Sequence, residues 1–372
     1  MHLRDFSLER FFARHEFSAR FMLGASDVEP FSLDELLALA DAETLRLWSR
    51  LGLGYTETRG LPALRDAVAI QYDGLDPDDI VVCAGAEEGI FLLMHVLLSP
   101  GDHAVVITPA YQSLSELPRA IAGENAVTRV TLDTRDWSLD VDAVERAITS
   151  RTKVVVVNSP NSPTGAQFSR AALDRLVAAC ESRGIALLSD EVYRLLEFDP
   201  ADRLPAAATL GDRTVSLGVM SKAFGLAGLR IGWIATRDAG LRGRVEAMKD
   251  YTTICASAPA EVLSLIGLRA SDSVLDRSRT IVTANLDLLD AFFQRNGERI
   301  SWVRPRAGSV SFPRLARGDA DRLAEELIER ESVVVVSGSH FEWDSRHFRL
   351  GFGRRDMSAA LERLERFLRR WD

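Results

Sequence analysis

The chain has 372 residues, of which 47% are hydrophobic, and a formal net charge of -9 at pH 7. This length and composition allow a large buried core and more than one domain, whereas the acidic charge disfavours binding to nucleic-acid phosphates. No apolar run approaches the ~20 residues that span a bilayer, and residues 1–6 lack the apolar stretch of a secretory signal. Cys83, Cys180 and Cys255 are too far apart in sequence to suggest a disulfide framework or a zinc site. We therefore expect a cytoplasmic protein with no membrane or nucleic-acid partner.

The first 80 residues predict helices and turns rather than strands. Ser32 is a suitable N-cap for a helix that follows it, and residues 52–62 form a turn-rich segment that contains Tyr55. From residue 80 onward, short Val/Ile/Leu runs alternate with helical stretches. The expected strands are Ile80–Cys83, Ala104–Ile107, Val127–Leu132, Val154–Val157, Ile185–Leu188, Thr214–Leu217 and Leu229–Ile234. Helices are expected between most of them, including Glu87–Leu98, Val141–Thr149, Arg170–Arg183 and Leu241–Lys249.

This alternation predicts an α/β fold in which a mostly parallel sheet, here of seven strands, lies between layers of helices. The sequence leaves open whether the last strand runs antiparallel. A long helix containing Leu286–Phe293 then leads to a second set of elements. They are Ile300–Val303, Ser309–Phe312, a helix around Ala320–Arg330, Val333–Val336, Phe348–Phe352 and a final helix from Met357 to Arg370. We assign residues 41–280 to a large domain, and residues 1–40 with 281–372 to a smaller α+β domain.

Ligands of such sheets bind at the carboxyl ends of the strands, and unusual residues follow several of the expected strands. Gly85-Ala86-Glu87 forms a small-residue turn that leads into a helix, whose free amides and dipole would attract an anion. Tyr111 places an aromatic ring after the next strand. Taken singly, these features are equally typical of a tight turn and of a core tyrosine.

Two further strand ends carry polar residues. Residues 158–165 read Asn-Ser-Pro-Asn-Ser-Pro-Thr-Gly, a rigid loop that contains Asn161 and Ser162. Asp190 emerges at the end of a buried strand, where an unpaired carboxylate is unfavourable and requires a cation or strong donors. The alternative is that Asp190 caps the next helix.

The stretch from Val219 to Gly232 holds Ser221-Lys222, then a glycine-punctuated apolar run, then Arg230. A lysine amine traps carbonyl groups when its neutral form is accessible, and a guanidinium suits a phosphate. A surface lysine before a buried strand is the alternative. A lysine, an aspartate, an aromatic ring, an anion cradle and an arginine at the strand ends of one sheet suit one cofactor, pyridoxal 5'-phosphate (PLP).

With these motifs in this order, the chain resembles the class I/II aminotransferases of PLP fold type I across nearly its full length. The matching motifs are the Tyr55 segment, the Gly85 turn, Tyr111, the 158–165 loop, Asp190-x-x-Tyr193, Ser221-Lys222 with Arg230, and Arg349. Residues 25–32 and 221–230 look, more narrowly, like the branch of the family that contains capreomycidine synthase.

The resemblance implies a role for each of these residues. Lys222 would form a Schiff base with the cofactor and then carry the proton between the substrate and the cofactor. Asp190 would keep the ring nitrogen protonated, Tyr193 would donate to the ring hydroxyl oxygen, and Tyr111 would stack on the ring. The residues implied for the phosphate are Gly85, Ala86, Glu87, Ser221, Arg230 and, from the partner subunit of a homodimer, Tyr55.

The same resemblance implies that Arg349 binds the substrate carboxylate, with Gly24 and Asn161 beside it. Two positions depart from the family pattern. Ser162 stands where many relatives have an asparagine that touches the ring oxygen, and Val219 stands where many have a hydroxyl. Water, Asn158 or Asn161 would then supply the missing donor, and the Glu87 side chain is expected to point away from the phosphate.

The implied activity is transfer of an amino group from an amino acid to a 2-oxo acid. Elimination with ring closure, as in capreomycidine synthase, and decarboxylation are alternatives on the same scaffold, and Arg349 argues against decarboxylation. A non-catalytic PLP-binding module of a regulator is a third hypothesis, disfavoured because no basic helix-turn-helix segment precedes residue 40. The six histidines show no ligand spacing, so no metal site is expected.

Overall fold

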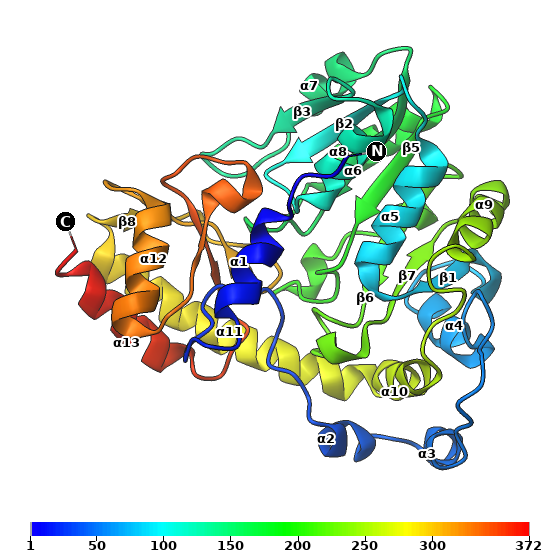
Figure 1. Cartoon of the computed structure of the whole chain (residues 1–372), viewed down its shortest axis with the longest axis horizontal. Coiled ribbons are helices and arrows are strands. Elements are labelled where there is room, and N and C mark those ends of the chain that lie inside the picture. Colours follow the sequence, from blue (N-terminus) through cyan, green and yellow to red (C-terminus); the bar gives the residue numbers. More distant parts are fainter. Residues whose placement is uncertain (1, 372) are drawn as a thin grey trace.

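The computed structural model describes residues 2–371. Within these residues, a sheet of seven strands forms the centre of the larger part of the molecule, with helices on both faces (Figure 1). The strands are β1 (Ile80–Cys83), β2 (His103–Thr108), β3 (Val127–Thr131), β4 (Thr152–Asn158), β5 (Ala186–Asp190), β6 (Thr214–Val219) and β7 (Gly232–Ala235). Their order across the sheet is β1-β7-β6-β5-β4-β2-β3.

The sheet is parallel except at β7. Strands β3, β2, β4, β5 and β6 pair in parallel, whereas β7 is antiparallel to both β6 and β1. The prediction of a mostly parallel sheet is therefore confirmed. The expected strand Leu229–Ile234 is wrong at its start, because Leu229 ends a 3-10 turn and Arg230 has a left-handed backbone, with φ of 53°. That conformation is incompatible with a strand, so β7 begins only at Gly232.

Alternate side chains of β4 point into two different cores, one on each face of the sheet. Val154 and Val156 of β4 pack in the core under α5 (Gly85–Leu97), α6 (Ser113–Ala122) and α9 (Ala239–Lys249). Val155 and Val157 pack on the opposite face, in the core that includes α7 (Val141–Ala147) and α8 (Arg170–Glu181). Both faces are covered in this way, which explains why the strands read as continuous apolar runs.

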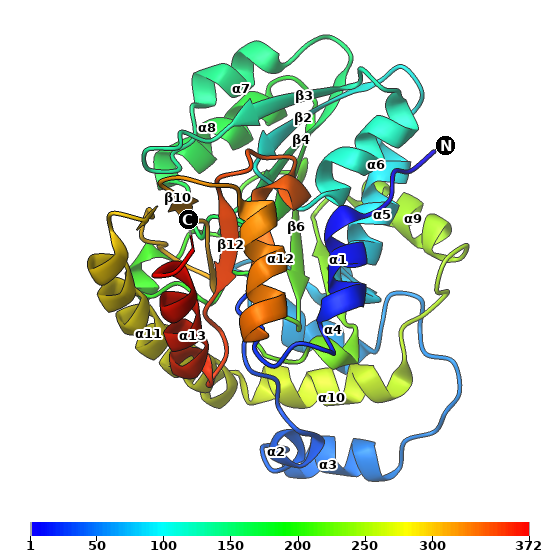
Figure 2. The same cartoon turned by 60° about the vertical axis from the view of Figure 1, so that its left-hand side comes forward.

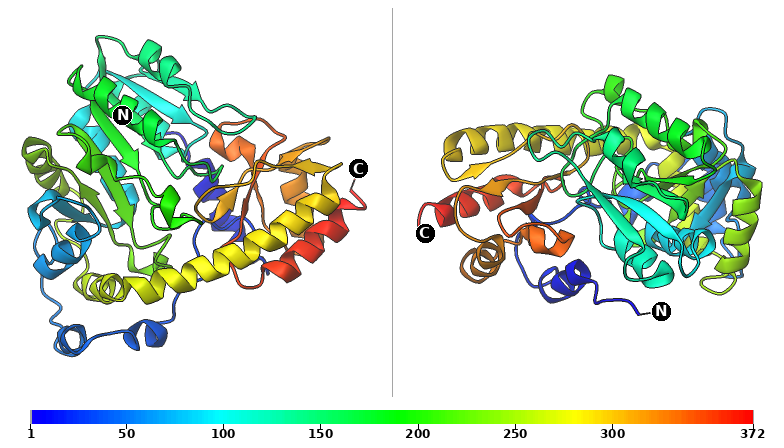
Figure 3. Two further views of the ribbon diagram at one scale, coloured as in Figure 1. Left: turned by 180° about the vertical axis from the view of Figure 1, so that it is seen from behind. Right: turned by 90° about the horizontal axis from the view of Figure 1, so that it is seen from above.

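A second group of elements follows the sheet, and Figure 3 shows the long helix α11 running from beside the sheet to the C-terminal end, with α13 alongside it. Residue 280 lies inside α11. Of the expected strand Val333–Val336, only Val336 is in β11; Val333 instead forms an isolated bridge with Phe21. The elements are α10 (Ala258–Arg269), α11 (Ser271–Asn296), β8 (Ile300–Ser301), β9 (Val310–Ser311), β10 (Arg314–Leu315), α12 (Ala320–Glu331), β11 (Val336–Ser337), β12 (Phe348–Gly351) and α13 (Met357–Leu368).

The N-terminal segment lies between these two groups. Figure 2 shows α1 (Ser7–His15) beside α12 and in front of the sheet. The backbone of residues 21–29 is then hydrogen-bonded to the second group of elements, which we call the C-terminal group. There, Gly351 N–H donates to Leu23 O and Glu29 N–H donates to Gly353 O. The chain continues through α2 (Leu33–Leu37), α3 (Ala42–Ser49) and α4 (Pro62–Ala69) before it enters the sheet. Within residues 2–371, no helix is both long enough and apolar enough to cross a membrane.

Candidate active site

The turn after β1 forms a tight cradle for an anion. Gly85 has φ of 77°, a left-handed conformation that suits glycine, and opens α5. A Cβ on Gly85 would lie 2.5 Å from Nη2 of Arg230, so the guanidinium lies directly against this turn. Among the described residues, no side chain caps the first amides of α5. These amides and the guanidinium together suit a phosphate.

Ser221 and Gly232 complete the cradle. Nη1 of Arg230 donates to Ser221 Oγ at 3.3 Å. Two of the residues that the family resemblance implies for the phosphate are therefore in contact. Behind the turn, a Cβ on Gly232 would lie 2.7 Å from the amide nitrogen of Ala86, so the start of β7 packs directly on this backbone. The left-handed backbone at Arg230 turns its side chain toward Gly85 before β7 begins.

The Glu87 side chain turns toward α6. Its Oε2 accepts a hydrogen bond from Ser113 Oγ at 2.9 Å. Burial, with a smaller contribution from the carboxylates of Glu9 and Asp190, raises the pKa of Glu87 to about 7 against the opposing effects of the Ser113 hydrogen bond and Arg230. A carboxyl group whose pKa is about 7 is partly protonated at neutral pH. Its protonated form is uncharged and does not repel a phosphate, so Glu87 is compatible with a phosphate nearby.

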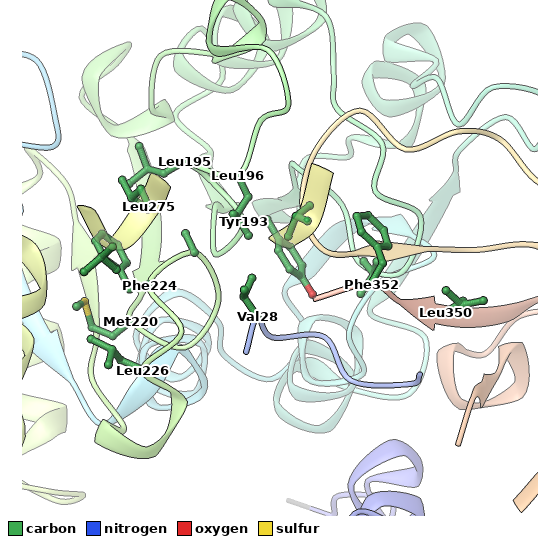
Figure 4. Close-up of a cluster of buried hydrophobic side chains, with 14 of the residues drawn as sticks. Val28, Tyr193, Leu195, Leu196, Met220, Phe224, Leu226, Leu275, Leu350 and Phe352 are labelled. Carbon is green, nitrogen blue, oxygen red and sulfur yellow. The ribbon is translucent and has the colours of Figure 1, made fainter. Parts of the chain in front are cut away.

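Asp190 and Tyr193 lie at the end of β5, and both are buried. Burial raises the pKa of Asp190 to about 6, against the opposing effects of the Val192 amide, which donates to its Oδ1 at 3.2 Å, and of Lys222. Burial also raises the pKa of Tyr193 to about 12. Figure 4 shows Tyr193 between Val28 and Phe352, so the N-terminal and C-terminal segments enclose its ring. A buried carboxylate with so few donors is suited to a cationic ligand.

The polar loop after β4 holds its own shape. Asn158 donates from Nδ2 to the carbonyl of Asp190 at 2.9 Å and accepts from the amide of Ser162 at 2.6 Å. Asn161 donates to Pro109 O at 3.1 Å and accepts from Thr164 Oγ1 at 2.7 Å. Both asparagines therefore fix the loop against its neighbours. The Ser162 side chain forms a hydrogen bond with the Tyr193 hydroxyl that lowers the pKa of that group.

Lys222 lies just beyond the end of β6, at the centre of the site. Burial lowers the pKa of its amine, and Asp27 and Asp190 oppose this effect, whereas Arg349 adds to it. The amine therefore lies within electrostatic reach of groups from the sheet, the N-terminal loop and β12. A lysine with a lowered pKa has more of the neutral form that attacks carbonyl carbons.

Arg349, on β12, is 2% exposed and lies between two aromatic rings. Its Cζ is 5.2 Å from the ring centroid of Phe341 and 5.7 Å from that of Phe12. Nη2 donates to the carbonyl of Gly24 at 2.8 Å, whereas Nε has no partner among the described residues. A buried guanidinium with an unpaired donor is unfavourable without an anion, so this geometry favours a carboxylate ligand.

Two residues in the N-terminal segment belong to the site and were not predicted from the sequence. Ser26 accepts a hydrogen bond at Oγ from Lys222 Nζ at 2.8 Å. Glu9 of α1 accepts one from the hydroxyl of Tyr111 at 2.7 Å and also influences the pKa values of Lys222 and Arg349. Ser26 lies in the 25–32 motif, but that motif assigned it no role, and no motif marks Glu9, because both residues reach the site through long-range packing of the N-terminal segment.

Tyr55 lies apart from this set. It is 90% exposed on the loop between α3 and α4, and within residues 2–371 no hydrogen bond joins its hydroxyl to another group. The part of the chain that the structure describes also contains no group of three or more His, Cys, Asp or Glu side chains placed to hold a metal ion.

Comparisons with known proteins identify the family. Residues 27–364 match the family model of aminotransferase class I and II. A PLP-dependent aminotransferase from Streptococcus suis superposes with a TM-score of 0.93 at 30% identity and covers 100% of this chain and 99% of its own. The PLP-dependent cyclase OrfR has a TM-score of 0.91 at 28% identity, covering 100% and 99%. A probable N-succinyldiaminopimelate aminotransferase of Mycobacterium tuberculosis is 34% identical over 77% of this chain and 74% of its own.

These findings favour transamination over the elimination and cyclisation that we kept as alternatives. The curated relatives include aminotransferases of alanine and aspartate and a probable aminotransferase of N-succinyldiaminopimelate, and the solved relatives include an aspartate aminotransferase of Thermus thermophilus. The cyclase shows that the same fold also supports ring closure in another protein. The chain belongs to the class I and II aminotransferases and is a PLP-dependent aminotransferase of fold type I.

Proposed function

We propose that Lys222 is the residue that binds the cofactor covalently and moves the proton during amino transfer. The observation that carries this proposal is that the amine donates to Ser26 Oγ at 2.8 Å and that Asp190 and Arg349 both act on its pKa. The amine is therefore near a carboxylate that suits a cationic ring and near a guanidinium that suits a carboxylate. A lowered lysine pKa supplies the neutral amine that both tasks require.

Two observations support the fit of the site to PLP. The Gly85 turn has open amides and lies against Arg230, which suits the phosphate. Asp190 is a buried carboxylate with a raised pKa, which a protonated ring nitrogen would lower again. When bound, PLP supplies an aldehyde for the amine and a ring that accepts the electrons released at the substrate carbon.

The roles of the surrounding residues follow from their contacts. The amides of Ala86 and Glu87, with Ser221 and Arg230, bind the phosphate, and Tyr111 packs against the ring. Tyr193 donates its hydroxyl proton to the carbonyl of Ser26 at 2.9 Å, so donation to the cofactor requires this hydroxyl to turn. Asn161 already donates to Pro109 O, and Asn158 already accepts from the amide of Ser162. Ser162, whose side chain contacts the Tyr193 hydroxyl, is therefore the residue that would take the place of the usual asparagine.

Arg349 binds the substrate. A carboxylate can occupy Nε and the remaining nitrogen protons of this guanidinium, while the carbonyl of Gly24 holds Nη2 in place. The two aromatic rings around Arg349 exclude water and strengthen the interaction. The carboxylate is thereby fixed, which orients the α-carbon toward the amine of Lys222 in both the amino acid and the 2-oxo acid.

Replacement of Lys222 by alanine tests the assignment. We expect Lys222→Ala to lose the visible absorbance of the lysine-linked cofactor and its reductive attachment by borohydride. Amino transfer should fall by about 10³-fold or more. Lys153→Ala is the matched control, because Lys153 is an exposed lysine on β4. Covalent attachment and full turnover in Lys222→Ala would contradict the proposal, whereas product analysis with each amino acid identifies the substrate.

We also propose a homodimer in which Tyr55 contacts the phosphate bound by the partner subunit. Tyr55 and its neighbour Leu53 are 90% and 84% exposed, and Tyr251 is 88% exposed, which supports a surface that another subunit covers. Mixing Tyr55→Phe and Lys222→Ala subunits tests this arrangement. A hybrid dimer has one site with both native residues, so activity should rise above that of either variant. No recovery in a mixture that forms hybrids would contradict it.

The division into domains remains a proposal as well. We assign residues 41–280 to the large domain, and residues 1–40 and 281–372 to the small domain. The contacts of the N-terminal segment support this division, because Phe21 bridges to Val333 and Ser7 contacts His340 at 2.6 Å. Limited proteolysis with and without a bound substrate analogue would test whether these segments move as one unit.

A further inference from the structure

The loop of residues 24–29 joins both halves of the molecule at the Lys222 amine. Its backbone is fixed to the C-terminal group, and Asp27 forms an ion pair with Arg354 at 2.9 Å. Ser26, in the middle of this loop, faces the sheet and makes three hydrogen bonds. Its carbonyl accepts from the Tyr193 hydroxyl and from Ser309 Oγ, both at 2.9 Å, and its own hydroxyl accepts from Lys222 Nζ at 2.8 Å.

These contacts restrict the position of the serine hydroxyl. Two donors from different elements hold the carbonyl of Ser26, so the residue cannot shift without breaking both bonds. Val28, two positions later, packs against Tyr193 and further fixes the loop (Figure 4). The hydroxyl is therefore a preorganised acceptor for the amine, and holding a reacting group in place contributes directly to rate.

We propose that Ser26 is a positioning residue that holds the Lys222 amine in the orientation from which it moves the substrate proton. This inference rests on the proposed role of Lys222. In that step the C–H bond of the α-carbon breaks, its electron pair stays with the substrate and cofactor, and the proton forms an N–H bond on Nζ. The ammonium that results has a proton to donate to Ser26 Oγ, which stabilises it and directs its remaining protons.

The charges around the amine come from several elements. Asp27 on the same loop, Asp190 on β5 and Glu9 on α1 favour the charged amine, whereas burial and Arg349 on β12 disfavour it. Ser26 differs from all of these groups because it touches the amine itself. Removal of its hydroxyl should therefore lower the pKa of Lys222 and loosen the position of Nζ, with no change in the surrounding charges.

The experiment compares Ser26→Ala with Ser26→Thr, which keeps a hydroxyl, and with Ser309→Ala. Ser309→Ala removes one bond to the carbonyl of Ser26 and leaves its hydroxyl in place, so it reports the structural contribution of the loop. The first readout is the pKa of Lys222 in the cofactor-free protein, measured by competitive acetylation at a series of pH values with mass spectrometry of the modified peptide. The second is kcat and KM for an amino acid and for the same amino acid deuterated at the α-carbon.

For Ser26→Ala we expect a lower Lys222 pKa, a fall in kcat of about tenfold with a nearly unchanged KM, and a larger deuterium effect on kcat. Ser26→Thr should recover most of each change, and Ser309→Ala should keep the wild-type pKa. An unchanged Lys222 pKa and kcat in Ser26→Ala, or equal changes in Ser309→Ala, would overturn the inference. If Lys222→Ala itself keeps activity, the proposed function fails instead, so the two failures are distinguishable.

Discussion

The site draws on two regions of the molecule that are built in different ways. The strand ends of the sheet supply Gly85, Asp190 and Lys222, and their positions follow from the register of neighbouring strands. The N-terminal segment and β12 supply Ser26 and Arg349, which reach the same place through contacts between residues hundreds of positions apart. The first region is fixed by the register of neighbouring strands, whereas the second is fixed by backbone and side-chain hydrogen bonds between segments far apart in the sequence.

This difference assigns separate tasks to the two regions. Backbone turns at the sheet edge suit a cofactor that stays bound through many turnovers, because their amides cannot rotate away. Side chains on segments that join the halves of the molecule suit a substrate that enters and leaves. Changes at Gly85 in the first region should therefore act on cofactor affinity and stability, and changes at Arg349 in the second should act on substrate binding.

Among the changes that distinguish the two regions, the largest effect is expected from Arg349→Ala. Removal of this guanidinium should raise KM for the amino acid by about 100-fold, because charge-assisted hydrogen bonds to the carboxylate contribute about 1.5–3 kcal/mol. The absorbance and affinity of the bound cofactor should stay close to those of the wild type. Steady-state kinetics with Arg314→Ala as the control, an exposed arginine on β10, checks this expectation. An unchanged KM would remove Arg349 from substrate binding.

Much of the first region could be predicted from the sequence, and the reason is local. The runs Val154–Val157 and Ile80–Cys83 mark buried strands, so the residues that follow them must meet at one edge of the sheet. The start of β7 could not be predicted in this way, because the apolar run continues through Leu229. The hydrophobic pattern does not indicate the left-handed turn at Arg230.

The second region was predicted only in part. Arg349 was found because it matches a family motif, although its burial between Phe12 and Phe341 was not foreseen. Ser26 and Glu9 were not predicted. Apolar periodicity and residue spacing do not indicate which polar side chain contacts a lysine or tyrosine that is far away in the sequence. Contacts of this kind depend on how α1 and the 24–29 loop settle on the rest of the fold.

A smaller effect is expected at the cradle, from Gly85→Ala. The added Cβ would lie 2.5 Å from Nη2 of Arg230 and would occupy a left-handed backbone, with φ of 77°. We expect a loss of about 1–2 kcal/mol in the free energy of unfolding and about tenfold weaker cofactor binding. Titration of the cofactor-free protein with PLP and denaturant unfolding measure both quantities.

Gly101→Ala is the control that separates the strain of a left-handed backbone from the contact of the added Cβ with Arg230. Gly101 also has a left-handed backbone, with φ of 90°, but an added Cβ would meet no atom of the described residues within 4 Å. Its substitution should lower the free energy of unfolding by about 1 kcal/mol and leave cofactor affinity unchanged. Equal loss of cofactor binding in both variants would mean that the Arg230 contact contributes nothing to the cradle.

Glu87, where the two regions meet, should make the stability of the protein depend on pH. Its pKa is about 7 in the folded protein against an ordinary value of 4.5, so the folded state binds more protons than the unfolded state between these values. Stability must then fall as the pH rises through this window. Relative to Glu87→Gln, the wild-type protein without cofactor should lose about 3 kcal/mol of unfolding free energy between pH 4.5 and 8. Asp190 titrates in both proteins, and its repulsion of Glu87 is part of the difference.

Glu9→Gln then measures how far the N-terminal helix reaches into the first region. The carboxylate of Glu9 raises the pKa of Glu87, so its removal should lower that pKa and move the stability loss to lower pH. Denaturant unfolding of wild type, both single variants and the double variant across this pH range gives the coupling directly. Additive effects would show that α1 does not influence the cradle electrostatically, and the two regions would then be independent of each other.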